Sequence, residues 1–209
     1  GQNMLQLQLS ISCPVTVYGQ DFAAHEEFGR MVYQDEFGLT DAPLPRLPGR
    51  HQLANAAAAI RAVKAAGFEV TERMVEKAMA SVEWPGRLQR IQDGKIADLA
   101  PKGAEIWVDG GHNPGAGEVI AEAMAGFEEK KPRPLFIIAG MINTKDPVGY
   151  FKAFADIAEY VFTVPISGTD AAIDPVVLAH AAFDAGLVAA PTFSISEALA
   201  ELLRHFDPE

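Results

Sequence analysis

The amino-acid sequence predicts an α/β fold whose larger part is a mostly parallel sheet flanked by helices. First, short apolar runs alternate with helical segments between residues 106 and 205, a pattern typical of parallel strands covered on both faces. Second, three of those helices begin with an N-cap residue followed by proline at the first helical position: Asn113-Pro114, Asp146-Pro147 and Asp174-Pro175. Third, a Pro-Gly break at residues 84–87 separates this part from a smaller region with short strands and two helices.

The composition limits the function before any motif is considered. The chain has 209 residues, enough for one large or two small domains, with a formal net charge of −11 and one cysteine, Cys13. Nucleic acids and anionic membranes attract clustered Lys and Arg, so we expect neither as a partner. A single cysteine excludes an internal disulfide and fits a reducing compartment, and we expect Cys13 to be a small buried residue. No apolar run of about 18 residues and no cationic leader is present, so we expect a cytoplasmic protein.

Residues 1–47 are expected to form a small, partly β region. Residues 1–18 alternate weakly between apolar and polar side chains, which indicates one or two short strands. Met31–Tyr33 and Gly38–Leu39 look extended around an Asp-Glu turn, whereas Asp21–Phe28 has no clear period. A linker that cannot be helical follows, marked by three prolines: Pro43, Pro45 and Pro48.

The next segment predicts a pair of helices that form a hairpin. Residues 52–66 are rich in strong helix formers and are followed by Gly67 as a stop signal. Thr71 is placed to cap a second helix that runs to residue 82, with apolar residues at intervals of three and four. Asn55 lies among the alanines of the first helix, so we expect it to be buried and to serve as a cap or a core hydrogen-bonding group.

Residues 84–87, Trp-Pro-Gly-Arg, end the helical pair and predict a hinge between two domains. Arg87 lies on this hinge, where its guanidinium could reach an anion held between the domains. The simpler interpretation is a solvated linker charge. Beyond the hinge, residues 88–92 and 95–99 flank Gly94 and are predicted to pair as a hairpin.

The rest of the chain predicts strands and helices in alternation. We expect strands at residues 106–109, 135–139, 160–164 and, more weakly, 192–195. We expect helices from 114 to about 127, from 147 to about 159, from 175 to 185 and from 197 to 205, the last capped by Ser194 or Ser196. The sequence stops at residue 209, where another strand is due, so we expect a truncated domain.

The stretch from Asp109 to Pro114 places polar groups where a ligand binds in α/β folds. It joins the end of an apolar strand to the start of a helix, through two glycines that allow a ligand close to the backbone. Asp109 could accept from a ribose or an amine, and His112 could donate to a phosphate or carboxylate. Alternatively, Asp109 only fixes the turn and His112 is a surface residue.

Several well-known catalytic motifs are missing. The sequence contains no GxxxxGK[ST] phosphate loop, no GxGxxG after a strand and no GxSxG elbow, and its five histidines lack metal-ligand spacing. From its residues alone, the chain has groups that could bind an anionic ligand but no complete catalytic set.

Four separate motifs, in matching order, resemble the folylpolyglutamate synthase/dihydrofolate synthase family of the Mur-ligase superfamily. The likeness covers nearly the whole chain from about Cys13 and is strongest to bacterial bifunctional enzymes. The motifs are LPGRHQLANAA at 47–57, WPGR at 84–87, DGGHNP at 109–114, and GM followed by NTKD at 140–146.

The resemblance implies a Rossmann-like C-terminal domain and an ATP-dependent ligase. Such an enzyme adds L-glutamate to dihydropteroate, to the γ-carboxylate of folates, or to both, through an acyl phosphate. By position, Asn55 would contact the adenine, Arg87 the ATP phosphates and Asp109 the ribose. His112 would act at the catalytic centre, orienting glutamate or the acyl phosphate, and Lys145 would bind a glutamate carboxylate, although a helix-capping loop charge explains Lys145 as well. His51 and Gln52 belong to the first motif without an assigned role.

The sequence also departs from the family. The family's N-terminal region, with the phosphate loop, the Mg²⁺ ligands and a carbamylated lysine, is absent, as is a last strand with a Gly-Ser-x-Tyr motif. We therefore expect residues 1–83 to be the end of the ATP-binding domain, 84–87 the hinge and 88–209 an incomplete glutamate-ligase domain. This chain should be inactive alone, and the full-length enzyme should be a monomer that uses ATP and Mg²⁺. The alternatives are a non-catalytic nucleotide-binding module and a Mur-type ligase that adds amino acids to a cell-wall precursor.

Overall fold

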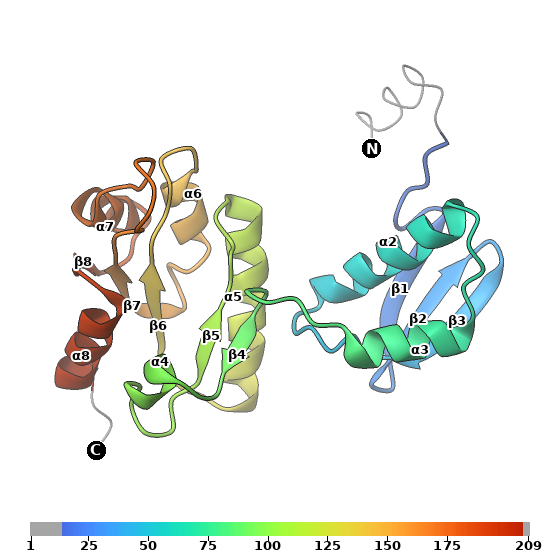
Figure 1. The fold of residues 1–209 in the computed structure, drawn as a ribbon, viewed down its shortest axis with the longest axis horizontal. Coiled ribbons are helices and arrows are strands. Elements are labelled where there is room, and N and C mark those ends of the chain that lie inside the picture. Colours follow the sequence, from blue (N-terminus) through green and yellow to red (C-terminus); the bar gives the residue numbers. More distant parts are fainter. Residues whose placement is uncertain (1–13, 207–209) are drawn as a thin grey trace. The chain divides into compact units, whose positions relative to one another are not determined.

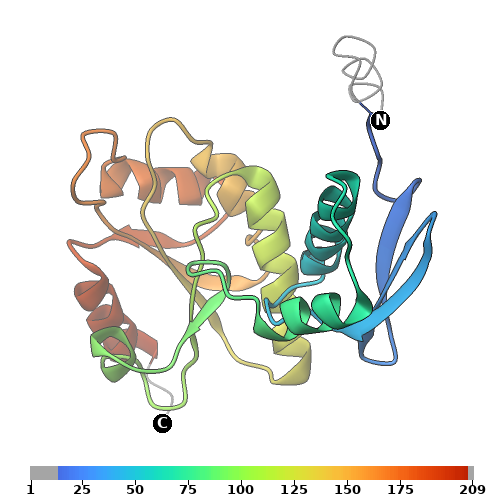
Figure 2. The same ribbon diagram turned by 45° about the vertical axis from the view of Figure 1, so that its right-hand side comes forward.

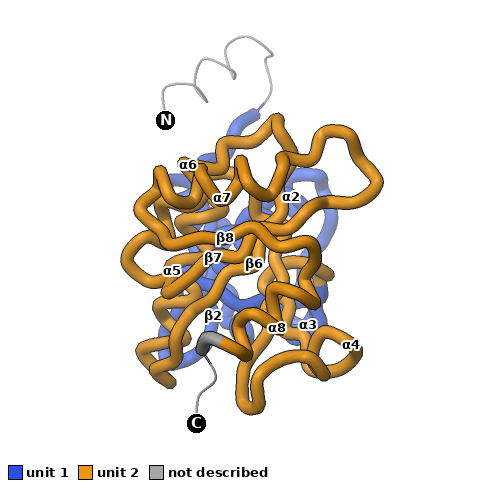
Figure 3. Tube along the Cα trace, turned by 90° about the vertical axis from the view of Figure 1, so that its left-hand side faces the viewer, with its two compact units in different colours: residues 1–83 blue, residues 84–209 orange. Residues whose placement is uncertain are grey.

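The structure, a computed structural model, describes residues 14–206 and forms two compact units, residues 1–83 and 84–209 (Figure 3). The side chains of residues 205 and 206 are not part of this description. The strands predicted before residue 14, and the burial predicted for Cys13, lie outside the described residues. The assignment of the two units to an ATP-binding and a glutamate-ligase domain stays a prediction.

The first unit is an antiparallel sheet with two helices on one face (Figures 1 and 2). Its strands follow each other in chain order: β1 (Phe22–Glu27), β2 (Arg30–Asp35) and β3 (Gly38–Pro43). The helices are α2 (His51–Ala65) and α3 (Glu72–Ser81), which pack on β1 and β3. Met31, Tyr33 and Ala42 are fully buried beneath the helices, because alternate residues of each strand face the same side.

Most elements of this unit were predicted, with three corrections. Strand β1 lies in the segment that had no clear period, because two of its outward residues are alanine and histidine and the alternation is therefore weak. Val15 and Val17 are not in a strand; Val17 instead accepts turn hydrogen bonds from residues 20 and 21. Asn55 is exposed, not buried. The helix ends are as expected, with Thr71 accepting from Met74 N and Gly67 at a positive φ of 85°.

The core of the second unit is a parallel sheet covered on both faces. It consists of β6 (Leu135–Ala139), β7 (Ala158–Thr163) and β8 (Ala189–Pro191) in that order. One face packs on a cluster that includes α5 (Pro114–Lys130), α6 (Pro147–Lys152) and α7 (Pro175–Asp184). The other face, with Phe136, Ile138 and Phe162, packs against α8 (Ile195–Phe206). The predicted parallel sheet with helices on both sides is therefore confirmed.

The first strands of this unit pair differently from the prediction. Strand β4 (Gln89–Ile91) pairs antiparallel with β5 (Ile106–Val108). The predicted hairpin between residues 88–92 and 95–99 is wrong, because Lys95–Asp98 forms the short helix α4. Gly94 takes a positive φ of 87° at the start of that helix and does not form a hairpin turn.

The three Asx-Pro helix starts are confirmed, and two element boundaries are corrected. Asn113 accepts from Ala116 N, Asp146 from Gly149 N and Asp174 from Val176 N. The helix predicted to reach residue 159 ends at Lys152, and β7 already begins at Ala158. The last strand lies at residues 189–191, before the predicted 192–195, and Ser194 caps α8 through Glu197 N.

Within residues 14–206, no helix is both long enough and apolar enough to cross a bilayer.

Candidate functional site

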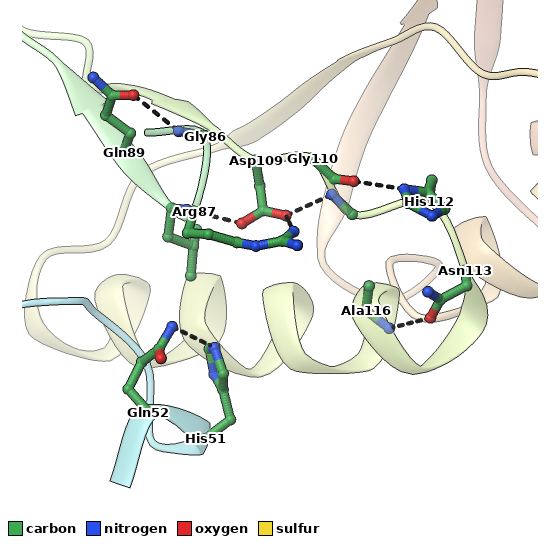
Figure 4. Close-up of polar contacts among 12 residues, drawn as sticks. His51, Gln52, Gly86, Arg87, Gln89, Asp109, Gly110, His112, Asn113 and Ala116 are labelled. Carbon is green, nitrogen blue, oxygen red and sulfur yellow. Dashed lines mark hydrogen bonds and ion pairs between the residues drawn. The ribbon is translucent and has the colours of Figure 1, made fainter. Parts of the chain in front are cut away.

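Asp109 joins the end of β5 to the segment before β4 (Figure 4). Its Oδ2 accepts from Leu88 N at 2.8 Å and its Oδ1 accepts from Gly111 N at 2.6 Å. The side chain is 16% exposed. An ionised carboxylate offers about four acceptor positions, so two remain for a ligand hydroxyl after these two bonds. The structural role and the ligand-binding role predicted for Asp109 are therefore compatible.

Arg87 lies beside Asp109, as the hypothesis of a shared site requires. Its Nη1 is 3.8 Å from Asp109 Oδ1, and its side chain is 50% exposed. The turn that carries Arg87 is held by Gly110 N, which donates to Gly86 O at 2.8 Å, and by Gly86 N, which donates to Gln89 Oε1 at 3.0 Å. The guanidinium is thus anchored near one carboxylate and keeps donors for an anion from solvent.

Leu88, between Arg87 and β4, has a backbone conformation that the sequence did not predict. It is buried, and its backbone has a positive φ of 41°, which is unfavourable for a branched side chain. Such strain persists only where the surrounding structure enforces it, here through the bond from Leu88 N to Asp109. No local pattern marks Leu88, because the bond joins residues 21 positions apart.

His112 is exposed at the start of α5. Its Nδ1 lies 2.7 Å from Gly110 O, and because a carbonyl can only accept, Nδ1 carries the proton. With Nδ1 bound to this carbonyl, Nε2 is the ring nitrogen that stays available to a ligand. Gly111 has no room for a side chain, since a Cβ atom would lie 2.6 Å from Ile120 Cδ1. The close packing of this loop on α5 fixes the backbone position of His112.

Lys145 lies in the loop that follows β6, next to the α6 cap Asp146. The structure describes no ion pair for its ammonium group among residues 14–206. Glycines bring α6 against α5: a Cβ atom at Gly117 would lie 2.6 Å from Tyr150 O, and one at Gly149 would lie 2.7 Å from Pro114 Cγ. His112 and Lys145 therefore lie in the loops that precede α5 and α6, two helices that pack against each other.

Tyr150 adds a buried phenol beneath this site. Burial and the negative charge of Asp109 raise the pKa of Tyr150 to about 12. The phenol is therefore protonated throughout the physiological range.

Asn55 belongs to a hydrogen-bonded chain of side chains in the first unit. Asn55 Nδ2 donates to Gln52 Oε1 at 3.1 Å, and Gln52 Nε2 lies 2.9 Å from His51 Nε2 (Figure 4 shows the second contact). Gln52 is 6% exposed, whereas Asn55 is exposed. The buried polar residues of this helix are thus Gln52 and Arg61, neither of which carried a predicted role.

Among residues 14–206, no group of three or more His, Cys, Asp or Glu side chains is placed to hold a metal ion.

Sequence comparison identifies relatives that span far more than this chain. The chain is 27% identical over 175 residues to the dihydrofolate synthase/folylpolyglutamate synthase of Haemophilus influenzae, covering 80% of this chain and 39% of the relative. It is 30% identical over 150 residues to the enzyme of the same name from Escherichia coli K12, covering 71% of this chain and 32% of the relative. No family model matches the chain. The matched part of the chain therefore spans 32–39% of the length of these relatives.

Solved structures show the same fold. Escherichia coli FolC in complex with DHPP and ADP superposes with a TM-score of 0.75 at 20% identity, over 98% of this chain and 45% of that one. The Yersinia pestis bifunctional folylpolyglutamate synthase/dihydrofolate synthase with Mn, AMPPNP and L-glutamate bound gives a TM-score of 0.77 at 17% identity, over 99% of this chain and 45% of that one. At these identities the likeness establishes the fold.

Proposed function

We propose that this chain, a homologue of the folylpolyglutamate synthase/dihydrofolate synthase family, supplies nucleotide- and glutamate-contacting residues to an ATP-dependent ligase. The ligase adds L-glutamate to dihydropteroate, to the γ-carboxylate of a folate, or to both. ATP phosphorylates the pterin-bearing carboxylate and leaves as ADP. The amine of L-glutamate then attacks the acyl phosphate, which forms the amide and releases phosphate.

The junction of Arg87 with Asp109 is the observation that carries the proposal. The half-exposed guanidinium would neutralise charge on the ATP phosphates, and the remaining lone pairs of Asp109 would accept from the ribose hydroxyls. The carboxylate of Asp109 is fixed by main-chain hydrogen bonds before a ligand binds, and the turn that carries Arg87 is held by the bond from Gly110 N to Gly86 O. Fixed donors and acceptors of this kind stabilise a transition state without reorganisation.

His112 and Lys145 would act on the second substrate. With its proton on Nδ1, His112 offers Nε2 to the amine of L-glutamate, as an acceptor that orients the nucleophile for attack. Lys145 would pair with a carboxylate of the same glutamate. Asn55, in the first unit, would contact the adenine. Mg²⁺ is the ion that we expect with ATP.

The test is a ligation assay on the full-length product of the gene that encodes this chain. Incorporation of labelled L-glutamate into dihydropteroate and into tetrahydrofolate, with and without ATP, identifies the reaction and the acceptor. Arg87→Ala and Asp109→Ala should each lower kcat/KM for ATP at least tenfold, a loss of about 1.4 kcal/mol of transition-state stabilisation. Wild-type rates in both variants would refute the assignment of this junction as the nucleotide site. Nucleotide binding without glutamate incorporation would instead favour a non-catalytic binding module.

The same preparation tests the expected cellular context. We propose a monomeric full-length enzyme in the cytoplasm, without a nucleic-acid partner. Sedimentation equilibrium measures the oligomeric state, and cell fractionation measures the location of the protein.

A further inference from the structure

The hydrogen bond between Gln52 and Asn55 on α2 decides which end of the Asn55 amide is available to a ligand. A side-chain amide has one acceptor and two donor hydrogens, and the two ends differ in what they can bind. Asn55 uses one Nδ2 hydrogen on Gln52 Oε1. Its second Nδ2 hydrogen and its Oδ1 are free to face a ligand, because Asn55 is exposed and the described residues provide no bond to that oxygen.

The contact between Gln52 and His51 fixes the donor-to-acceptor direction of the hydrogen bonds that join His51, Gln52 and Asn55. The amide nitrogen of Gln52 can only donate, so its contact with His51 makes Nε2 of the imidazole the acceptor. Gln52 Oε1 then points to Asn55 and must receive a donor. Gly49 packs against the same imidazole: a Cβ atom there would lie 2.5 Å from His51 Cε1, and its φ is 105°. The ring is therefore held in place from the other side.

We infer that Gln52 is a positioning residue that turns Asn55 Oδ1 outward and thereby selects a purine with a 6-amino group over one with a 6-oxo group. This inference rests on the proposed role of Asn55 at the adenine. An asparagine reads adenine with two bonds, accepting from N6 and donating to N7. A 6-oxo purine presents acceptors at both positions, so Asn55 Oδ1 would face another oxygen.

The expected selectivity follows from the strength of such a pair. A two-bond amide contact discriminates by about 1–3 kcal/mol, which is roughly a 5- to 150-fold preference in kcat/KM for ATP over ITP. Turning both amides over would present Nδ2 to the purine and reverse the preference. The reversed arrangement also needs a proton on His51 Nε2.

Two substitutions at Gln52 separate orientation from packing. Gln52→Leu removes the acceptor that holds Asn55, so its amide can rotate and the ATP/ITP preference should fall at least fivefold. Gln52→Glu keeps an acceptor for Asn55 Nδ2, and the preference should stay within about twofold of the wild type. Gln34→Leu, at an exposed position on β2, is the matched control and should leave both nucleotides unaffected. Melting temperatures of all variants show which of them fold.

The experiment measures kcat/KM for ATP and ITP in the full-length protein and, independently of ligation, competition by ADP and IDP for nucleotide binding. An equal loss for both nucleotides in Gln52→Leu would show a purely structural role and overturn the inference. The inference also fails if Gln52→Glu loses the preference as Gln52→Leu does, or if the wild type binds IDP as tightly as ADP. A protein that prefers ADP over IDP but ligates no glutamate would refute the ligase proposal and leave the role of Gln52 intact.

Discussion

Replacing Asp109 with asparagine tests whether both of its carboxylate oxygens hold the strand-end junction. Leu88 N and Gly111 N each donate to a different oxygen of Asp109. Asparagine keeps one oxygen and places an NH₂ group against the other donor. One main-chain N–H is left without a partner, which costs about 1–3 kcal/mol, and the remaining bond loses its charge, which costs about 1 kcal/mol more. We expect the free energy of unfolding to fall by about 2–4 kcal/mol.

Asp146→Asn is the matched control. Asp146 also accepts from a main-chain N–H, that of Gly149, but as the N-cap of α6 it uses only one oxygen. Asparagine caps helices about as well as aspartate, so only the favourable charge at the helix start is lost. We expect a change below about 1 kcal/mol.

Urea unfolding of the chain, followed by Trp107 fluorescence, measures both variants. Trp107 is a suitable probe because it lies in β5 and stacks on Phe127 with ring centroids 4.7 Å apart. A midpoint shift in Asp109→Asn no larger than in Asp146→Asn would show that the second oxygen contributes nothing. The reasoning about the junction would then be refuted.

Two further predictions concern helix packing and pH. Gly117→Ala should destabilise the second unit by about 1–3 kcal/mol, because the added Cβ would overlap the Tyr150 carbonyl. Gly126→Ala, on the same helix, adds a Cβ in open space and should stabilise the unit by up to about 1 kcal/mol. Melting temperatures that shift in the same direction in both variants would contradict this. Burial by itself raises the pKa of Asp35, but hydrogen bonds from Lys64 and Tyr33 outweigh it and hold the pKa below its ordinary value. The stability due to Asp35 is therefore full above the unfolded pKa of about 4 and is lost as the pH falls through the folded pKa, so denaturant titrations at pH 7 and pH 3 should show a smaller acid loss in Asp35→Asn.

Local signals were sufficient for much of the secondary structure. Apolar runs predicted β6 and β7, and the three Asx-Pro pairs predicted helix starts that the structure confirms. They failed where pairing partners are distant. Strand β4 pairs with β5 across 15 to 19 residues, so a hairpin with the adjacent segment looked equally suitable in sequence.

The candidate site divides in the same way. The residue types at Arg87, Asp109 and His112 were evident from their motifs, and the roles assigned to them stay predictions. The strained backbone of Leu88, which brings the arginine to the aspartate, has no sequence signature. Asn55 was expected to be buried among alanines, but it is exposed, and the buried polar residues of the helix are Gln52 and Arg61, which lie on the face that packs on the sheet.

The sequence by itself determined most of the helices and strands, and the polar groups that cap the helices. Those properties depend on side-chain periodicity, caps and turn residues within a few positions of one another. Only the tertiary structure decided that Leu88 N and Gly111 N share one carboxylate, and that a buried amide orients Asn55. Such contacts depend on the direction of individual donors and acceptors after the chain has packed, and no local pattern encodes that direction.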